Sequence, residues 1–113
     1  MESPFLESVY NIGVIPVLEI DRAERAVRLA ESLLSGGLQI AEITLRTAAA
    51  LESIRSVAQN VPLVLVGAGT VINLEQAQAA CDAGAKFLVS PGLAEKVIIL
   101  PTVTPRQPKL FPR

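Results

Sequence analysis

Residues 37–47 read GLQIAEITLRT, and apolar and β-branched residues after two glycines predict a β-strand here. Because the side chains of a strand alternate between its faces, one face is apolar and holds Ala41, Ile43 and Leu45. The opposite face holds Ile40, Glu42, Thr44 and Arg46. A carboxylate, a hydroxyl and a guanidinium are costly to bury unless they bind something, so this face is a candidate active-site face.

The neighbouring strand candidates indicate that both faces are covered. They lie at residues 14–18, 63–66 and 87–89, and all three are almost continuously apolar. Such runs are typical of parallel strands that are packed on both sides. Among these strands, only the one at 37–47 carries a polar stripe.

Segments with helical periodicity separate the strands. Apolar residues at i, i+3, i+4 and i+7 predict helices over residues 23–34, 51–60 and 73–84. Asp21, with Glu24 three residues later, is the expected cap of the first helix, and Asn73 with Gln76 opens the third. This alternation of strands and helices predicts an α/β fold with a parallel sheet.

Composition limits the class of protein. The chain has 113 residues, of which 50% are hydrophobic and 4% aromatic, so it is one domain at most. A net charge of −1 gives no electrostatic case for binding nucleic acid or an anionic membrane. No basic leader and no long apolar run is present, so a soluble cytoplasmic protein is expected.

The lack of histidine narrows the chemistry. Without histidine, and with a single cysteine, the chain can form no His-ligated or multi-Cys metal site and no disulfide. The cysteine, Cys81, is expected to pack in the core. Catalytic triads based on histidine are also excluded. Carboxylate acid/base chemistry, a lysine Schiff base, and anion binding by arginine and backbone amides remain open.

Several motifs resemble those of one family. Residues 37–46 are similar to the active-site signature of the 2-keto-3-deoxy-6-phosphogluconate / 4-hydroxy-2-oxoglutarate aldolases. Three further segments resemble the family in the family's order, namely IPVL at 15–18, VGAGTV at 66–71 and VSPGL at 89–93. The resemblance runs from the first predicted strand to Leu93.

The resemblance implies a class I aldolase of carbohydrate metabolism, including the Entner–Doudoroff route. Such a lyase cleaves 2-keto-3-deoxy-6-phosphogluconate, 4-hydroxy-2-oxoglutarate or both to pyruvate and an aldehyde. It works through a lysine Schiff base without a metal or other cofactor. Its fold is a (β/α)₈ TIM barrel, and its usual assembly is a homotrimer. The expected partner is a small 2-oxo acid.

The resemblance also implies roles for individual residues. Glu42 would be the general acid/base, a task that suits a carboxylate inside a barrel. Arg46 would clamp the pyruvyl carboxylate with its planar donors, and Thr70 would complete that carboxylate site. Read alone, Glu42 and Arg46 could instead be a pair on a solvated strand face, and residues 67–70 could be an ordinary tight turn.

The Schiff-base lysine is expected at Lys109. The chain has only Lys86, Lys96 and Lys109, and the last begins a KLFP segment that resembles the family's lysine motif. Lys86 precedes a strand, at the end of a barrel that supports stability, and Lys96 is expected in a solvated helix start. The helices that separate the family's later motifs are missing before Lys109.

The length predicts an incomplete barrel. A (β/α)₈ barrel needs at least about 200 residues, so residues 1–100 are expected to form about half of one, as an open four-stranded sheet. Residues 101–113 are expected to be an irregular tail, because Pro101, Pro105, Pro108 and Pro112 cannot donate to a sheet ladder. Exposed strand edges and one bare sheet face would favour association.

Two origins and three functions remain open on the sequence. The chain could be a shortened aldolase reading frame with impaired activity, or a half-barrel that another chain completes. Besides an aldolase, it could be a non-catalytic half-barrel that holds a 2-oxo acid through Arg46 and Thr70. It could also be a self-associating structural fragment.

Overall fold

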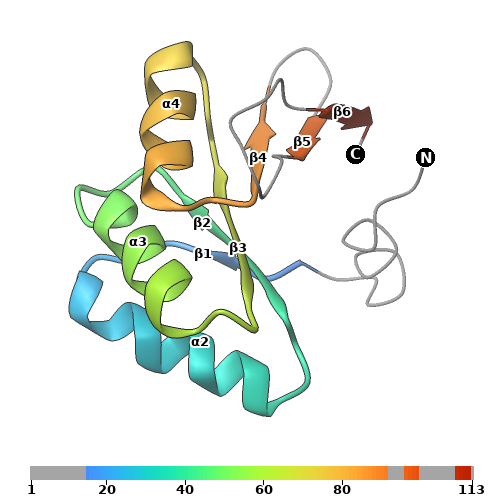
Figure 1. The fold of residues 1–113 in the computed structure, drawn as a ribbon. Helices are drawn as coiled ribbons and strands as arrows, with labels where there is room; N and C mark the ends of the chain where they lie inside the picture. The colour runs from blue at the N-terminus through green and yellow to red at the C-terminus, as the bar shows by residue number, and fades with distance from the viewer. Residues whose placement is uncertain (1–14, 92–95, 100–108, 113) are drawn as a thin grey trace.

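The computed structural model describes residues 15–91, 96–99 and 109–112. Strands and helices alternate through most of this part (Figure 1). In chain order the elements are β1 (Val17–Leu18), the 3₁₀ helix η1 (Ala23–Arg25), α2 (Ala26–Ser35), β2 (Ile40–Thr44), α3 (Ala50–Asn60), β3 (Leu65–Gly69), α4 (Leu74–Ala83), β4 (Phe87–Ser90), β5 (Lys96–Ile99) and β6 (Lys109–Pro112). The predicted α/β alternation is therefore confirmed.

The strands form one sheet in the order β1-β2-β3-β4-β5-β6. β1 to β4 run parallel, as predicted, and each is joined to the next by a helical crossover. Parallel strands need such a connection because the chain must return to the starting edge. The register pairs Glu42 with Gly67 and Thr44 with Gly69, which places the second strand's polar stripe beside two glycines.

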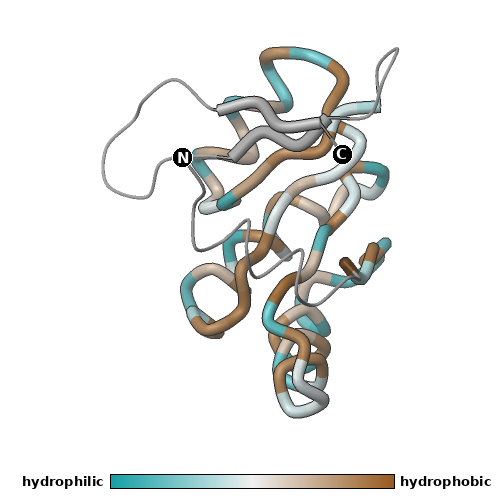
Figure 2. The backbone as a smooth tube through the Cα atoms, turned by 90° about the vertical axis from the view of Figure 1, so that its right-hand side faces the viewer, coloured by the Kyte–Doolittle hydropathy of each residue, from teal (hydrophilic) through white to brown (hydrophobic). Residues whose placement is uncertain are grey.

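The helices lie together on one side of the sheet (Figure 1). The larger core fills the space between them and includes Ala41 and Ile43 of β2. A second, smaller cluster on the other face consists of Ile40, Phe87 and Val89. The predicted alternation of β2 is thus confirmed, since Ala41 and Ile43 belong to one cluster and Ile40 to the other. In Figure 2 the strands run largely through hydrophobic segments, whereas the helices alternate between hydrophobic and hydrophilic residues.

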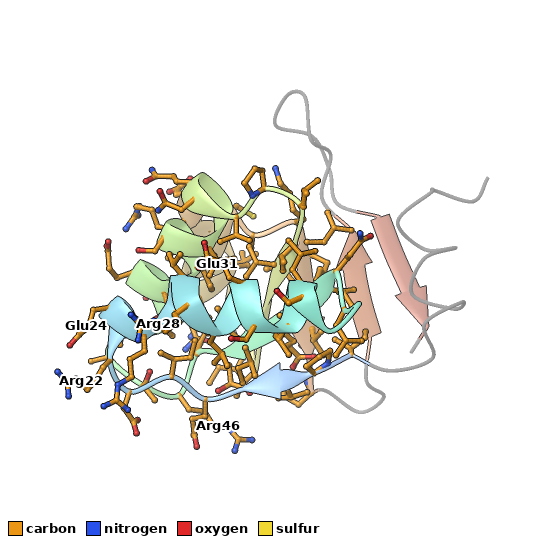
Figure 3. All side chains as sticks on the ribbon, turned by 90° about the horizontal axis from the view of Figure 1, so that it is seen from below. Arg22, Glu24, Arg28, Glu31 and Arg46 are labelled. Atoms are coloured by element: carbon orange, nitrogen blue, oxygen red, sulfur yellow. The ribbon has the colours of Figure 1, made fainter. Side chains whose placement is uncertain are left out.

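The predicted helix starts are right for α4 and wrong for α2. Asn73 caps α4 by accepting a hydrogen bond from the Gln76 amide at 2.8 Å, and the Gln76 side chain accepts from the Ile72 amide. Before α2 the chain enters η1 through Arg22, and no side chain caps it. Glu24 pairs with Arg22 at 2.8 Å instead of completing a cap with Asp21 (Figure 3).

The expectation of a bare four-stranded sheet followed by an irregular tail is wrong for the segments that the structure describes there. β5 pairs antiparallel with β4, and β6 pairs antiparallel with β5. β6 ends at Pro112 on the sheet edge, where a missing backbone donor costs little. Lys96 opens β5 rather than a helix. The turn and tail predictions at 92–95 and 100–108 lie outside the described residues.

The face opposite the helices is also not bare at its centre. Phe87 is fully buried there and Ile40 and Val89 are nearly so. Exposure persists at the β1 edge, where Val17 keeps 56% of its surface.

Candidate active site

A hollow of about 300 Å³ opens at the carboxyl ends of the parallel strands. The residues that line it come from β1, β2, the loop after β3, and the end of β4. They are Val17, Glu42, Thr44, Arg46, Thr70, Val89 and Pro91. Barrel enzymes keep their chemistry at this end of their strands. The structure therefore brings together Glu42, Arg46 and Thr70, which lie up to 28 positions apart in the sequence.

Glu42 is buried, with 5% of its surface exposed. It pairs with Gly67, but its carboxylate reaches along the sheet to Gly69, two residues closer to the carboxyl end. A Cβ atom added to Gly69 would lie 2.8 Å from Glu42 Cδ and closer still to a carboxylate oxygen. The absence of a side chain on Gly69 thus creates the space that the Glu42 carboxylate occupies.

Gly67 serves a second side chain in the same way. A Cβ atom added there would collide with the ring of Phe87, which packs across β3 from β4. The VGAG segment is therefore more than a turn, since its glycines admit a core ring and the candidate acid/base. Sequence analysis missed these two roles because the partners lie on other strands.

Thr44 lies between Glu42 and Arg46 on the polar stripe and is 6% exposed. Its Oγ1 atom is buried and has no hydrogen-bond partner among the residues that the structure describes. Ser53 on α3 is the other residue in that situation, but it lies in the core rather than at the hollow. The sequence placed Thr44 on the correct face, although nothing in the pattern showed that its hydroxyl is unpartnered.

Arg46 follows β2 and is exposed at the rim of the hollow. Figure 3 shows its side chain pointing away from the helices. Within the described part of the chain, no carboxylate forms an ion pair with Arg46. The loop that carries it is tied down because the Thr47 hydroxyl donates a hydrogen bond to the Ile20 carbonyl after β1. The exposed guanidinium thus presents its planar set of donors at the rim of the hollow.

Thr70 directly follows β3 and has φ of 59°, in the left-handed region. A β-branched residue is strained in that conformation, and such strain concentrates at functional sites. The strained turn brings Thr70 to the hollow, which is also lined by Val89 of β4 and by Pro91, which follows β4. This backbone feature favours a functional reading of the segment over an ordinary turn.

The backbone of Lys109 opens β6, and its side chain lies outside what the structure describes. Lys109 pairs with Ile99, and Ile99 pairs with Phe87 at the amino end of β4. Pro91, which lines the hollow, follows the carboxyl end of the same strand. The strand register therefore places the Lys109 backbone level with the amino end of β4, whereas the hollow lies at the carboxyl end of that strand.

Fold and hollow together define an α/β protein in which a buried carboxylate, an exposed arginine and two threonines line one small cavity. Across the described residues, no group of three or more His, Cys, Asp or Glu side chains gathers as a metal site. None of the helices in that part is long and apolar enough to cross a membrane.

Comparison with known proteins identifies the family. The sequence profile described as "KDPG and KHG aldolase" matches residues 6–110, so the chain belongs to this aldolase family. It is 44% identical over 93 residues to the KHG/KDPG aldolase of Escherichia coli K12, covering 81% of this chain and 44% of that protein. It is 48% identical over 93 residues to the 2-dehydro-3-deoxy-phosphogluconate aldolase of Dickeya dadantii, with the same coverage.

Solved structures agree with the sequence matches. The 2-keto-3-deoxy-6-phosphogluconate aldolase of Zymomonas mobilis superposes with a TM-score of 0.65 at 48% identity, over 70% of this chain and 38% of that one. A KDPG aldolase from Legionella pneumophila, solved with pyruvate captured as a covalent carbinolamine, superposes with a TM-score of 0.67 at 44% identity. The match covers 69% of this chain and 38% of that one. The chain thus spans less than half the length of each of these four relatives, and its βα units match part of their larger fold.

Proposed function

We propose that this chain supplies the acid/base and carboxylate-binding part of a class I aldolase site. The reaction would cleave 2-keto-3-deoxy-6-phosphogluconate, 4-hydroxy-2-oxoglutarate or both to pyruvate and an aldehyde. The observation that carries the proposal is the meeting of Glu42, Arg46 and Thr70 at one hollow. The Legionella relative, with its captured pyruvate carbinolamine, supports the choice of pyruvate as the common fragment.

Each residue has a chemical task in this proposal. Arg46 and Thr70 hold the carboxylate of the 2-oxo acid, which fixes the position of the adjacent ketone. A lysine amine, assigned to Lys109, adds to the ketone carbon to give a carbinolamine and then loses water to form an iminium ion. The C3–C4 bond breaks as its electron pair moves toward the iminium nitrogen and forms an enamine.

Glu42 moves the protons in that sequence. It accepts the proton of the C4 hydroxyl as the aldehyde leaves and returns a proton to C3 of the enamine. Hydrolysis of the resulting imine releases pyruvate and restores the lysine. A buried carboxylate that points into the hollow is suited to this exchange because its geometry is held by the surrounding strands.

Trapping with pyruvate and borohydride tests the lysine. Reduction of the imine should add a pyruvate-derived mass to the intact protein, and peptide mapping should locate it at Lys109. Lys109→Arg should lose the adduct, and Lys86→Arg, which changes a lysine at the amino end of β4, should keep it. An adduct that stays in Lys109→Arg would remove that residue from the role.

Glu42→Gln should nearly abolish proton transfer while leaving pyruvate bound. The amide keeps the shape of the side chain but cannot act as a base, and such groups contribute about 10²- to 10⁴-fold. Exchange of the pyruvate methyl protons with D₂O, followed by NMR, measures this step without the unknown aldehyde. Unchanged exchange in the variant would show that another group moves the proton.

A second candidate is a non-catalytic module that binds a 2-oxo acid. The observation that favours it is the register of β6, in which Lys109 lies in the row of Phe87 rather than near Pro91. This candidate predicts pyruvate binding that depends on Arg46, with no borohydride adduct on any lysine. Binding and trapping on the same sample therefore separate the two functions.

The proposal also covers the oligomeric state of the protein and its location in the cell. We infer a homo-oligomer, with the trimer of the family as the expected form, and a cytoplasmic site of action. The exposed β1 edge, where Val17 keeps 56% of its surface, is consistent with further chain contacts. Sedimentation equilibrium would measure the assembly, and a monomer at all accessible concentrations would contradict it.

A further inference from the structure

Thr44 carries a hydroxyl that no described residue of the chain bonds. Only 6% of the surface of Thr44 is exposed, and its Oγ1 atom is shielded from solvent. Among the described residues, this atom neither donates nor accepts a hydrogen bond. Buried polar atoms nearly always have partners, and exceptions in native structures need a reason. A ligand that supplies the partner is one such reason, because the hydroxyl lies at a hollow rather than in closed core.

The surroundings indicate which kind of ligand atom would meet this hydroxyl. Thr44 lies two residues before Arg46 on the same face of β2, and both line the hollow. Its partner in the register is Gly69, which has no side chain, and Thr70 follows at once. Thr44 therefore lines the same hollow as a guanidinium and a second hydroxyl, which favour an anionic acceptor oxygen.

We propose that the Thr44 hydroxyl donates a hydrogen bond to the carboxylate of the bound 2-oxo acid. This inference rests on the proposed function and adds a third carboxylate contact to Arg46 and Thr70. Because the Oγ1 atom is shielded from solvent when no ligand is bound, binding would turn the Thr44 side chain toward the hollow. Thr44 is accordingly a substrate-binding residue and not only a structural residue of β2.

Titration with pyruvate, followed by NMR, tests the contact. Thr44→Val keeps the shape and removes the hydroxyl, and a hydrogen bond to a charged group corresponds to roughly tenfold or more in affinity. Thr44→Val should therefore bind pyruvate about tenfold more weakly, and Thr44→Ser, which keeps the hydroxyl, should stay near the unaltered protein. Ser53→Ala is the matched control because it removes the other unpartnered buried hydroxyl, away from the hollow.

A second measurement separates binding from folding. Without pyruvate, Thr44→Val should be at least as stable to urea as the unaltered protein, since it removes an unsatisfied polar group. Equal pyruvate affinity in Thr44→Val and the unaltered chain would overturn the inference. If the unaltered chain itself fails to bind pyruvate, the proposed function falls first and this inference falls with it.

Discussion

At the scale of single residues, the site depends on side chains that are missing as much as on those present. Gly69 leaves the space for the Glu42 carboxylate, and Gly67 leaves the space for the Phe87 ring. The polar stripe on β2 was predictable because alternation is a property of the strand alone. The glycine roles were not, since they depend on which strand lies beside β2 and in what register.

Gly69→Ala should displace the Glu42 carboxylate and slow pyruvate methyl exchange by about 10²-fold, the cost of a misplacement near 1 Å. Gly36→Ala is the matched control, because a Cβ atom there would meet only the Leu33 and Ser32 carbonyls at 3.5 and 3.7 Å. NMR exchange rates compare the two variants. Equal rates would show that the carboxylate does not need the space at Gly69.

Cys81 packs against the core, and burial, followed by the charge of Asp82, raises the pKa of its thiol. We therefore expect it to react more slowly than free cysteine with a thiol reagent at pH 8. Because the pKa of this thiol is higher in the folded than in the unfolded chain, it contributes to stability. That contribution is fully present below the unfolded pKa of about 8.5 and is lost as the pH rises through the folded pKa. The urea midpoint should fall less between pH 7 and pH 10 in Cys81→Ala than in the unaltered protein. An equal fall in the two proteins would contradict the expectation.

At the scale of elements, the helix ends show where local sequence is sufficient. Asn73 and Gln76 lie within one turn, so the cap of α4 follows from their spacing. Asp21 has the same spacing to Glu24, yet Glu24 pairs with Arg22 and the chain enters through η1. Spacing alone therefore did not decide this helix start, where Glu24 takes Arg22 as its partner.

Asn73→Ala should cost about 1 kcal/mol of stability, the usual value of a lost N-cap. Asp21→Ala should change stability by less than about 0.5 kcal/mol because Asp21 caps no helix in the structure. Urea denaturation of both variants measures the difference. A larger loss in Asp21→Ala than in Asn73→Ala would reverse the assignment of the caps.

At the scale of the whole molecule, the sheet is packed on both sides. The helices cover one face, and the cluster of Ile40, Phe87 and Val89 lies on the other. Near-continuous apolar strands predicted this two-sided burial. The expectation of a bare second face was wrong at its centre, where Ile40, Phe87 and Val89 are buried together, with Ile15 and Leu65 packed against them.

Phe87→Ala should cost about 3 to 5 kcal/mol, because the ring is fully buried and its removal leaves a cavity over Gly67. Leu63→Ala is the control, since Leu63 keeps 68% of its surface exposed, and should change stability by less than about 0.5 kcal/mol. Thermal unfolding followed by circular dichroism compares them. A small effect of Phe87→Ala would mean that the second cluster contributes little.

The sequence by itself determined the βα rhythm, the two faces of β2 and the cap of α4, and it proposed Glu42, Arg46 and Thr70 as site residues. These follow from periodicity, local spacing and motif resemblance, which act over a few residues. Tertiary structure alone decided the space at Gly69, the burial of a Thr44 hydroxyl without a partner among the described residues, and the strained turn at Thr70. It also decided the pairing of β5 and β6 and the row in which Lys109 lies. These features depend on register between strands distant in sequence, which side-chain volumes and backbone pairing set only once the sheet has assembled.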